Sequence, residues 1–289
     1  MRGFSLSRAA QASVARALST LGGSGPLPVV AVTDQYATLL DNWIRHIEAL
    51  GIHRFLVVAM DRPLMDSLTK AGIVAAYCEF DGSVKDFWLQ RMLIWDLLVQ
   101  RGVDLIQSDI DAVWLKDPIP EYFSRTDFDL LISQGTFHPV ETHAHWQFVL
   151  CTGLFWARPG PGAKAFFSAW RSRGGEILAS DDQAVMNRLL HENGTVWCDT
   201  DLETYRLSCD GHTFTCYNHI LPGTCDSLGF RIGMLPHYLF PRLTSSERGA
   251  FVKHVRRPKD PCERISALRE AECWLLGDDF ADNIDERSI

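Results

Sequence analysis

Short, fully apolar runs alternate with amphipathic helical stretches in the first hundred residues, and this alternation constrains the fold most strongly. Strands that are apolar on both faces are typical of a parallel sheet with helices on its two sides. The predicted strands are residues 29–32, 55–60 and 74–77, and the predicted helices are residues 36–50, 63–71 and 87–101. This order indicates βαβ units. The sequence therefore predicts an α/β fold, a single Rossmann-like domain with a mostly parallel central sheet flanked by helices.

The second half of the chain is less regular. Further strands are predicted at residues 105–115, 128–133, 148–157, 232–235 and 251–255. Helices are predicted at 162–171, 181–191 and 262–276, and a loop at 134–146. We divide the chain into an N-terminal helix or flexible segment (1–25), one domain (26–276) and an acidic tail (277–289).

Composition excludes some classes of protein. With 289 residues, 46% of them hydrophobic and 22% charged, the chain is long enough for one large α/β domain. A net charge of −8 without a basic run gives no reason to expect a nucleic acid as partner. No apolar run approaches the ~20 residues of a transmembrane segment. We expect a soluble protein with no transmembrane segment and no nucleic-acid partner.

The first 25 residues contain Arg2, Arg8 and Arg16 spaced through Ala, Ser and Leu, and no acidic residue precedes Asp34. This pattern is typical of a transit peptide and equally of an amphipathic helix that packs outside the sheet. The compartment stays undecided: we expect either the cytoplasm or, if a membrane anchor is missing from this sequence, the Golgi lumen.

The eight cysteines do not decide the compartment either. Cys78 and Cys151 have apolar, strand-like neighbours, which is typical of buried thiols. Four others share one loop-rich stretch and are candidates for disulfides in an oxidising lumen. These four are Cys198, Cys209, Cys216 and Cys225. A repeated Cys-x-x-His at 209–212 and 216–219 also has a spacing that suits zinc.

Two carboxylates, Asp109 and Asp111, lie in the middle of the apolar run at 105–115. In a strand these side chains point the same way, because side chains alternate between faces. Like charges among apolar neighbours repel each other and are costly to desolvate, and a divalent metal between them removes both problems. The alternative is a turn or cap at a strand end.

Several segments in chain order resemble the GT-A-fold nucleotide-diphospho-sugar transferases. The most specific is Ser108-Asp-Ile-Asp-Ala-Val-Trp-Leu-Lys-Asp-Pro118, because the Asp-x-Asp of that family is typically followed by Val-Trp-Leu and Asp-Pro. The second is Asp182-Gln183 with Asn187 four residues later. The plant cell-wall xylosyl-, arabinosyl- and galactosyltransferases are the most similar group, and glycogenin-type retaining glycosyltransferases are more distant.

The resemblance implies a metal-dependent glycosyltransferase that moves a sugar from a nucleoside-diphosphate sugar, a UDP-sugar, with retention of configuration. The acceptor is then a hydroxyl of a glycan, protein or small molecule. Residues 26–130 are expected to form the nucleotide-binding half, 131–257 the acceptor half and 258–276 the terminal helix. Two alternatives stay open: a non-catalytic nucleotide-sugar-binding protein, and a metal-dependent phosphohydrolase, which has no use for Asp182-Gln183.

Metal ligands follow from the same resemblance. Asp109 and Asp111 are expected to bind Mn²⁺ or Mg²⁺ with His254 as the third ligand, and a histidine ligand favours Mn²⁺. His254 is alternatively an ordinary surface histidine, and His219 and His237 compete for the same role.

The resemblance also assigns donor-binding residues. Thr33 and Asp34 match the position that holds the nucleoside, and alternatively form a helix N-cap. Arg91 matches a basic position near the donor diphosphate or sugar, and alternatively lies on a solvated helix face or pairs with Asp96.

Four further residues match positions around the donor sugar. Thr152 and Gly153 match a pair under the sugar, where a missing side chain lets a ligand approach the backbone. Many relatives have Asn at Cys151 or Thr152, which leaves the sugar open. Gln183 matches a residue that stabilises a short-lived oxocarbenium ion, and Asp182 one that binds sugar hydroxyls. Asp182 alternatively belongs only to the first turn of a helix.

Overall fold

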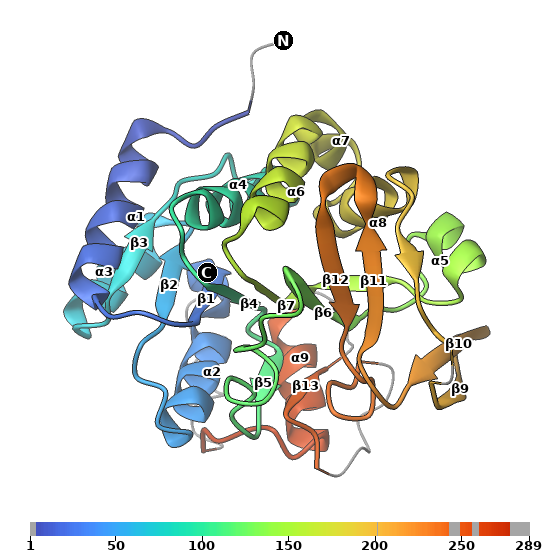
Figure 1. Cartoon of the computed structure of the whole chain (residues 1–289). Coiled ribbons are helices and arrows are strands. Elements are labelled where there is room, and N and C mark those ends of the chain that lie inside the picture. The colour runs from blue at the N-terminus through green and yellow to red at the C-terminus, as the bar shows by residue number, and fades with distance from the viewer. Residues whose placement is uncertain (1–3, 201, 243–248, 256–259, 278–289) are drawn as a thin grey trace.

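The computed structural model describes residues 4–200, 202–242, 249–255 and 260–277. In this part of the chain, one nine-stranded sheet forms the centre of the molecule (Figure 1). Its strands in spatial order are β3 (Ala75–Tyr77), β2 (Leu56–Ala59), β1 (Leu27–Val32), β4 (Leu105–Ser108), β7 (Leu150–Ala157), β6 (Leu130–Gln134), β12 (Phe230–Met234), β11 (Leu221–Cys225) and β8 (Val196–Trp197).

The sheet is mostly parallel, as the sequence predicts. β1 pairs in parallel with β2 on one side and β4 on the other, with Val29 opposite both Leu56 and Gln107. β7 runs antiparallel to both of its neighbours, and so does β11. Because β1 and β4 are adjacent and parallel, the residues that follow them meet at one edge of the sheet, where ligands bind in such folds.

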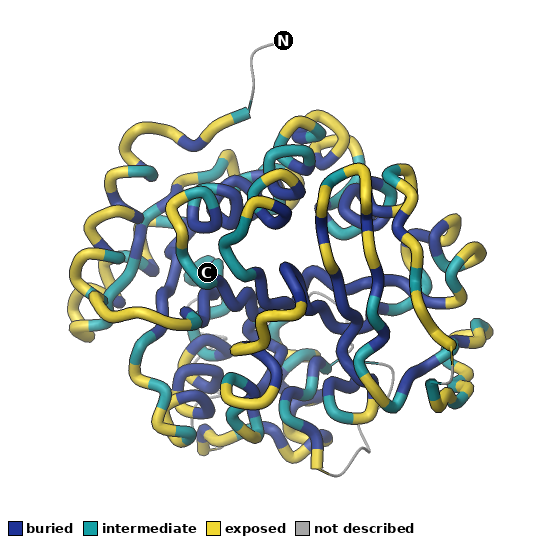
Figure 2. The backbone as a smooth tube through the Cα atoms, viewed as in Figure 1, coloured by how far each residue is buried: buried dark blue, intermediate teal, exposed yellow. Residues whose placement is uncertain are grey.

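Helices cover both faces of the sheet (Figure 1). One apolar core joins the sheet to α1 (Arg8–Leu21), α4 (Val84–Gln100), α6 (Pro161–Ser172), α7 (Gly174–Ala179) and α8 (Asp182–Glu192). The other core joins it to α2 (Ala37–Ala49), α3 (Arg62–Lys70), α9 (Pro261–Glu270) and the small ribbon of β5 (Ala112–Trp114) with β13 (Val252–His254). Figure 2 shows the buried sheet between the more exposed outer surfaces of the helices.

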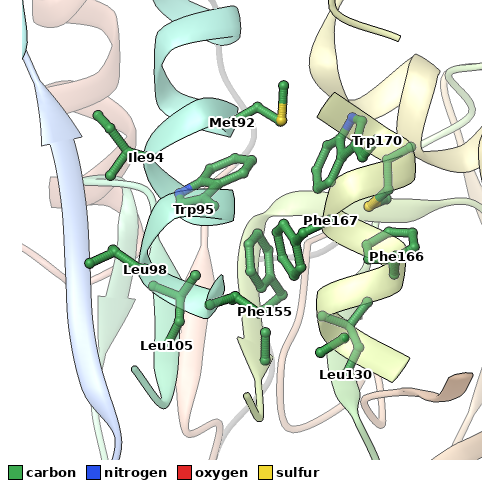
Figure 3. Close-up of a cluster of buried hydrophobic side chains, with 14 of the residues drawn as sticks. Met92, Ile94, Trp95, Leu98, Leu105, Leu130, Phe155, Phe166, Phe167 and Trp170 are labelled. Atoms are coloured by element: carbon green, nitrogen blue, oxygen red, sulfur yellow. The ribbon is translucent and has the colours of Figure 1, made fainter. Parts of the chain in front are cut away.

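Aromatic side chains fix α4 on the first face (Figure 3). The ring of Trp95 lies 5.0 Å from that of Phe155 on β7 and 5.6 Å from that of Trp170 on α6. Its indole N–H donates to Gln107 Oε1 at 2.8 Å, so the polar end of the ring is paired. Arg91 lies one helical turn before Trp95, and this packing therefore positions Arg91 beside the sheet edge.

Two tryptophans fix the end of β4 on the other face. The indole N–H groups of Trp43 and Trp114 both donate to Ser108 Oγ, at 3.0 and 3.2 Å. Ser108 is fully buried and immediately precedes Asp109. The backbone that leads into the carboxylate pair is thus held by buried hydrogen bonds.

The N-terminal segment forms the amphipathic helix α1. Its buried residues are Ala10, Ser13, Val14 and Ala17. Ser13 Oγ accepts the backbone N–H of Tyr77 at 2.8 Å, which pairs a donor of β3 at the end of the strand order. Among the described residues, no helix is long and apolar enough to span a bilayer.

Several sequence predictions of local structure are wrong. Residues 105–115 are not one strand, because β4 ends at Ser108 and a turn precedes β5. The predicted loop 134–146 contains helix α5 (Val140–Trp146), and the terminal helix ends at Glu270 rather than at residue 276. The sequence did not predict α7, β8, β11, the short helices η1 (Asp34–Tyr36) and η2 (Asp226–Leu228), or the hairpin of β9 (Thr204–Cys209) and β10 (His212–Tyr217).

The cysteine and tail predictions have different outcomes. None of the eight cysteines, all of which lie among the described residues, is in a disulfide, so the four in the loop-rich stretch are not bonded to one another. Cys209 and Cys216 lie on β9 and β10, a paired hairpin whose side chains alternate between faces. Residues 278–289 of the acidic tail lie outside the described residues.

Candidate metal and donor site

Asp109 and Asp111 lie in the tight turn between β4 and β5. The N–H of Asp109 donates to the carbonyl of Gly153 at 2.7 Å, and the N–H of Ala112 donates to the carbonyl of Asp109 at 3.0 Å. Aspartate is favoured in such turns because its side chain competes with backbone hydrogen bonds. The turn alternative is therefore correct for the backbone, although the two carboxylates still converge.

His254 reaches this turn through a strand pair. β13 runs antiparallel to β5 and places His254 opposite Ala112. The three predicted metal ligands come together as a result, with one ligand atom each from Asp109, Asp111 and His254 within 4.8 Å of one another. It is the one such group of three or more His, Cys, Asp or Glu side chains among the described residues.

Each carboxylate binds an arginine with one oxygen and turns the other toward His254. Arg91 Nη1 lies 2.8 Å from Asp109 Oδ1, and Arg264 Nη1 lies 3.0 Å from Asp111 Oδ2. His254 Nε2 lies 3.8 Å from Asp109 Oδ2 and 3.3 Å from Asp111 Oδ1. Two carboxylate oxygens and one imidazole nitrogen therefore face a common point.

The inner oxygen of Asp111 is a buried acceptor without a hydrogen bond among the described residues. Burial alone raises the pKa of Asp111, but His254, Arg264 and Arg242 together hold it below its usual value, so the group stays ionised. A buried anionic oxygen that accepts no hydrogen bond and lies 3.3 Å from a histidine nitrogen is suited to contact a cation. The donor set of two carboxylates and one imidazole fits a divalent cation such as Mn²⁺ or Mg²⁺.

His254 is not a surface histidine, since its side chain is only 3% exposed. Its Nδ1 lies 3.7 Å from the Sγ of Cys151, which leaves Nε2 to face the carboxylates. Burial and Arg242 disfavour the protonated ring, but the sulfur of Cys151 and the Asp111 carboxylate outweigh them and raise the pKa of His254. A partner on the second ring nitrogen is what orients metal-binding histidines in general.

The competing histidines are placed elsewhere. His219 is exposed in the segment between β10 and β11. His237 is buried, and burial lowers its pKa to about 4. Its Nδ1 is 2.9 Å from the Tyr205 hydroxyl, and its Nε2 accepts the N–H of Arg242. Both ring nitrogens of His237 are engaged, so neither competitor joins the carboxylate pair.

Gly153 of β7 lies directly against two residues of the candidate metal site. A Cβ at this position would lie 2.2 Å from Cε1 of His254 and 2.6 Å from Oδ2 of Asp109. Both distances are far below van der Waals contact, so only glycine fits. The close approach of His254 and Asp109, two candidate metal ligands, is a reason for this glycine that the sequence does not predict.

Arg91 is a buried residue that joins two carboxylates. Its Nη1 binds Asp109, and its Nε donates to Asp182 Oδ2 at 3.1 Å. Burial lowers the pKa of the guanidinium, but the two carboxylates outweigh burial and raise it. The alternatives for Arg91 are wrong: its side chain is only 8% exposed, and Asp96 pairs with Arg171 instead, at 2.8 Å.

The start of α8 carries the other predicted pair. Asp181 is the N-cap of this helix and accepts the N–H of Ala184. Asp182 is buried against Arg91, with Thr152 Oγ1 3.5 Å from its Oδ1. Gln183 donates from Nε2 to the carbonyl of His138 at 2.9 Å. Asp182 is therefore more than a first-turn residue, because it is part of the charged cluster around Arg91.

Asn187, which belongs to the same sequence signature, has a structural role. Its amide donates to the carbonyl of Leu150 and accepts the N–H of Leu150, both at 2.9 Å. It thereby holds α8 against the start of β7, which carries Cys151 to Gly153.

A cleft of about 340 Å³ opens beside the turn. Of the predicted residues, Thr33, Arg91 and Asp109 line it, whereas Asp34 lies next to it with its backbone N–H on Asp61 Oδ2 at 2.8 Å. The remaining lining is mostly aromatic or apolar, with one further arginine. These residues include Tyr36, Phe80, Val84, Phe87, Trp88 and Arg264. Tyr36, Phe87 and Trp88 lie at the starts of the predicted helices 36–50 and 87–101, whereas nothing in the sequence signals Arg264.

The comparison with protein families identifies one that covers most of the chain. A sequence model of the nucleotide-diphospho-sugar transferase family matches residues 50–269. The arabinosyltransferase XEG113 of Arabidopsis thaliana is 29% identical over 157 residues, covering 49% of this chain and 24% of that protein. The chain thus spans about a quarter of the length of this relative.

Solved structures of glycosyltransferases share the fold. The galactosyltransferase LgtC, solved with donor and acceptor sugar analogues, aligns with a TM-score of 0.50 at 12% identity, over 89% of this chain and 99% of that one. The bifunctional glycosyltransferase WbbM aligns with a TM-score of 0.51 at 10% identity, over 92% of this chain and 52% of that one. The fold is GT-A. By the extent of the family match, the chain belongs to the nucleotide-diphospho-sugar transferase family.

Proposed function

We propose that this protein transfers a sugar from a UDP-sugar to a hydroxyl acceptor, using a divalent cation held by Asp109, Asp111 and His254. The observation that carries the proposal is the inner oxygen of Asp111, which is buried, ionised and without a hydrogen bond, 3.3 Å from His254 Nε2. A bound Mn²⁺ or Mg²⁺ would neutralise the charge that develops on the diphosphate leaving group.

The charges around the site suit a diphosphate. Three carboxylates, Asp109, Asp111 and Asp182, are matched by Arg91, Arg264 and the nearby Arg242. The protein groups of this cluster are close to neutral together, so a divalent cation gives the cluster an excess of two positive charges. The two negative charges of a nucleoside-diphosphate sugar balance that excess.

The remaining predicted residues are assigned to the nucleoside and to the sugar of the donor. Thr33 lines the cleft and is assigned to the nucleoside with the adjacent Asp34. Asp182 is fixed by Arg91 and is assigned to sugar hydroxyls, with Thr152 and Gly153 beneath the sugar.

Gln183 is assigned to the anomeric carbon. Its amide nitrogen donates to His138, so the amide oxygen is the end available to a developing positive charge. An amide is a poor nucleophile, and we therefore expect retention through a short-lived oxocarbenium ion rather than a stable covalent intermediate.

The name of the Arabidopsis relative suggests a pentose donor, and a hexose is the alternative. Cys151 and Thr152 contact the residues assigned to the cation and the sugar, so they are expected to influence the choice between the two. The acceptor is a hydroxyl of a glycan, a protein or a small molecule.

The experiment that tests the proposal is a screen of UDP-pentoses and UDP-hexoses for UDP release in Mn²⁺, with and without chelator. We expect slow donor hydrolysis with at least one donor, abolished by chelator and by Asp111→Asn. Tight UDP binding without turnover on any donor or acceptor would instead indicate a binding protein. Release of UMP and a sugar 1-phosphate, without UDP or free sugar, would indicate a phosphohydrolase.

A further inference from the structure

Arg264 extends from the C-terminal helix α9 into the candidate site. Its Nη1 lies 3.0 Å from Asp111 Oδ2, and its guanidinium carbon lies 5.5 Å from the centre of the Tyr36 ring. Both Tyr36 and Arg264 line the cleft. The side chain of Arg264 is 21% exposed, compared with 8% for Arg91, so Arg264 is the more accessible of these two arginines.

The sequence of α9 explains this position. Asp260 caps the helix by accepting the N–H of Glu263 at 3.1 Å, and Pro261 occupies its first turn. Ile265 and Leu268, three residues apart, are buried in the second core. This apolar contact fixes the rotation of α9 and directs Arg264 toward the turn between β4 and β5.

The chain that follows α9 is also anchored. Asn42 of α2 donates to the carbonyl of Cys273 at 3.0 Å and accepts the N–H of Leu275 at 2.8 Å. Asn42 is fully buried, and its hydrogen bond to Cys273 is shielded from water. α9 is thus attached at its apolar face and beyond its end, and Arg264 projects from a rigid element.

The guanidinium lies at the boundary between the candidate metal ligands and the open cleft. It contacts the outer oxygen of Asp111, while the inner oxygen faces His254. A ligand that touches both the cation and the cleft must pass this boundary. Among the parts of a nucleoside-diphosphate sugar, only the diphosphate carries the charge that a guanidinium recognises there.

We propose that Arg264 is a donor-binding residue that bridges Asp111 and an oxygen of the donor diphosphate. It acts together with Arg91, which lines the same cleft and binds Asp109 and Asp182. This assignment rests on the proposed function, because it requires a nucleoside diphosphate in the cleft. It predicts that Arg264 distinguishes a diphosphate from a bare nucleoside.

The test compares the binding of UDP and of uridine in Mn²⁺ by calorimetry. Replacing Arg264 by Gln is expected to weaken UDP binding about 10- to 100-fold, which is the loss of one charge-assisted hydrogen bond. Uridine binding is expected to stay within about twofold. The affinity for Mn²⁺ alone is expected to change less than the affinity for UDP, because Arg264 contacts the outer oxygen of Asp111 and not the oxygen that faces His254. Arg264→Lys keeps the charge but not the two-pronged geometry of the guanidinium, and its UDP affinity is expected to lie between those of wild type and Arg264→Gln.

Arg269→Gln is the matched control. Arg269 lies on the same helix, with its guanidinium 5.8 Å from the centre of the Trp274 ring, and does not line the cleft. This variant is expected to bind both ligands like wild type. Unfolding temperatures of all variants show whether a loss of binding reflects a loss of folding.

Two results would overturn the assignment alone. One is wild-type UDP affinity in both Arg264 variants, and the other is an equal loss of UDP, uridine and Mn²⁺ binding, which means that Arg264 only supports Asp111 and Tyr36. A wild-type protein that binds no UDP in Mn²⁺ would overturn the proposed function and this assignment together.

Discussion

Gly153 and His254 are in such close contact that no side chain larger than hydrogen fits between them. A Cβ on Gly153 would lie 2.2 Å from Cε1 of the histidine ring. Gly153 belongs to β7 and His254 to β13, and Asp109, which receives the second contact, follows β4. The small size of one residue in β7 thus permits two candidate metal ligands from other strands to converge.

Substituting Gly153→Ala is expected to displace His254 and Asp109. We predict a loss of Mn²⁺ affinity of at least about tenfold and a destabilisation of about 1–3 kcal/mol from overpacking. Titration of Mn²⁺ by electron paramagnetic resonance and urea unfolding measure the two effects. Gly175→Ala is the control, because this exposed glycine of α7 meets its nearest side-chain atom at 3.9 Å. Wild-type Mn²⁺ affinity in Gly153→Ala would contradict the crowding described here.

Cys151 is predicted to orient the ring of His254. Removing the sulfur with Cys151→Ala takes away the partner 3.7 Å from Nδ1, and we expect Mn²⁺ to bind about tenfold more weakly. Cys151→Ser supplies a hydroxyl to the same nitrogen and is expected to restore part of the affinity. A merely structural role predicts the reverse ranking, since alanine suits the buried position better than a hydroxyl does.

Mn²⁺ binding is predicted to depend on pH through His254. The neighbouring sulfur and carboxylate raise the pKa of this ring above its usual value of 6.5. A proton competes with the cation for Nε2, so affinity is expected to fall as the pH drops from about 8 to 6. Calorimetry in buffers of different ionisation enthalpy measures the released proton. Binding that is constant over this range and releases no proton would exclude His254 as a ligand.

Asp104 is predicted to give the folding stability its own pH dependence. Burial raises the pKa of Asp104 to about 6, against the opposing effects of the Trp156 indole N–H and Arg158. Between pH 3.8 and about 6 the folded state therefore binds more protons than the unfolded state, and stability falls as pH rises through this window. Asp104→Asn removes this slope. In urea unfolding at several pH values, the free energy of unfolding of the variant should increase relative to that of wild type up to about pH 6. The same pH dependence of the free energy of unfolding in variant and wild type would contradict this role of Asp104.

Much of the fold is predictable because the apolar residues that mark a strand or helix in the sequence are the residues that the structure buries. The strand at residues 29–32 and the helix at 36–50 follow from apolar spacing, and both positions are confirmed by β1 and α2. α5 was missed because Thr142 is its only buried residue, so it has no apolar stripe for a pattern to detect. The turn at Asp109 is predicted only as an alternative, because apolar residues on both sides favour a continuous strand.

The candidate site was predictable in a different way. Asp109 and Asp111 lie two residues apart in the sequence, and their like charges alone point to a cation, whereas His254 is predicted only through a family resemblance. The contact of Cys151 with His254 and that of Arg264 with Asp111 join segments far apart in the chain. Pairings of this kind depend on how β5 meets β13 and how α9 packs, which no local pattern contains.

The central claim is that Asp109, Asp111 and His254 form a cation site that serves a nucleoside diphosphate. The most direct measurement is UDP binding by calorimetry in Mn²⁺ and in chelator, for wild type and Asp111→Asn. We predict that wild type binds UDP at least about tenfold more tightly in Mn²⁺ and that folded Asp111→Asn shows no such difference. Equal UDP affinity in Mn²⁺ and chelator for wild type, or an undiminished Mn²⁺ effect in Asp111→Asn, would contradict it.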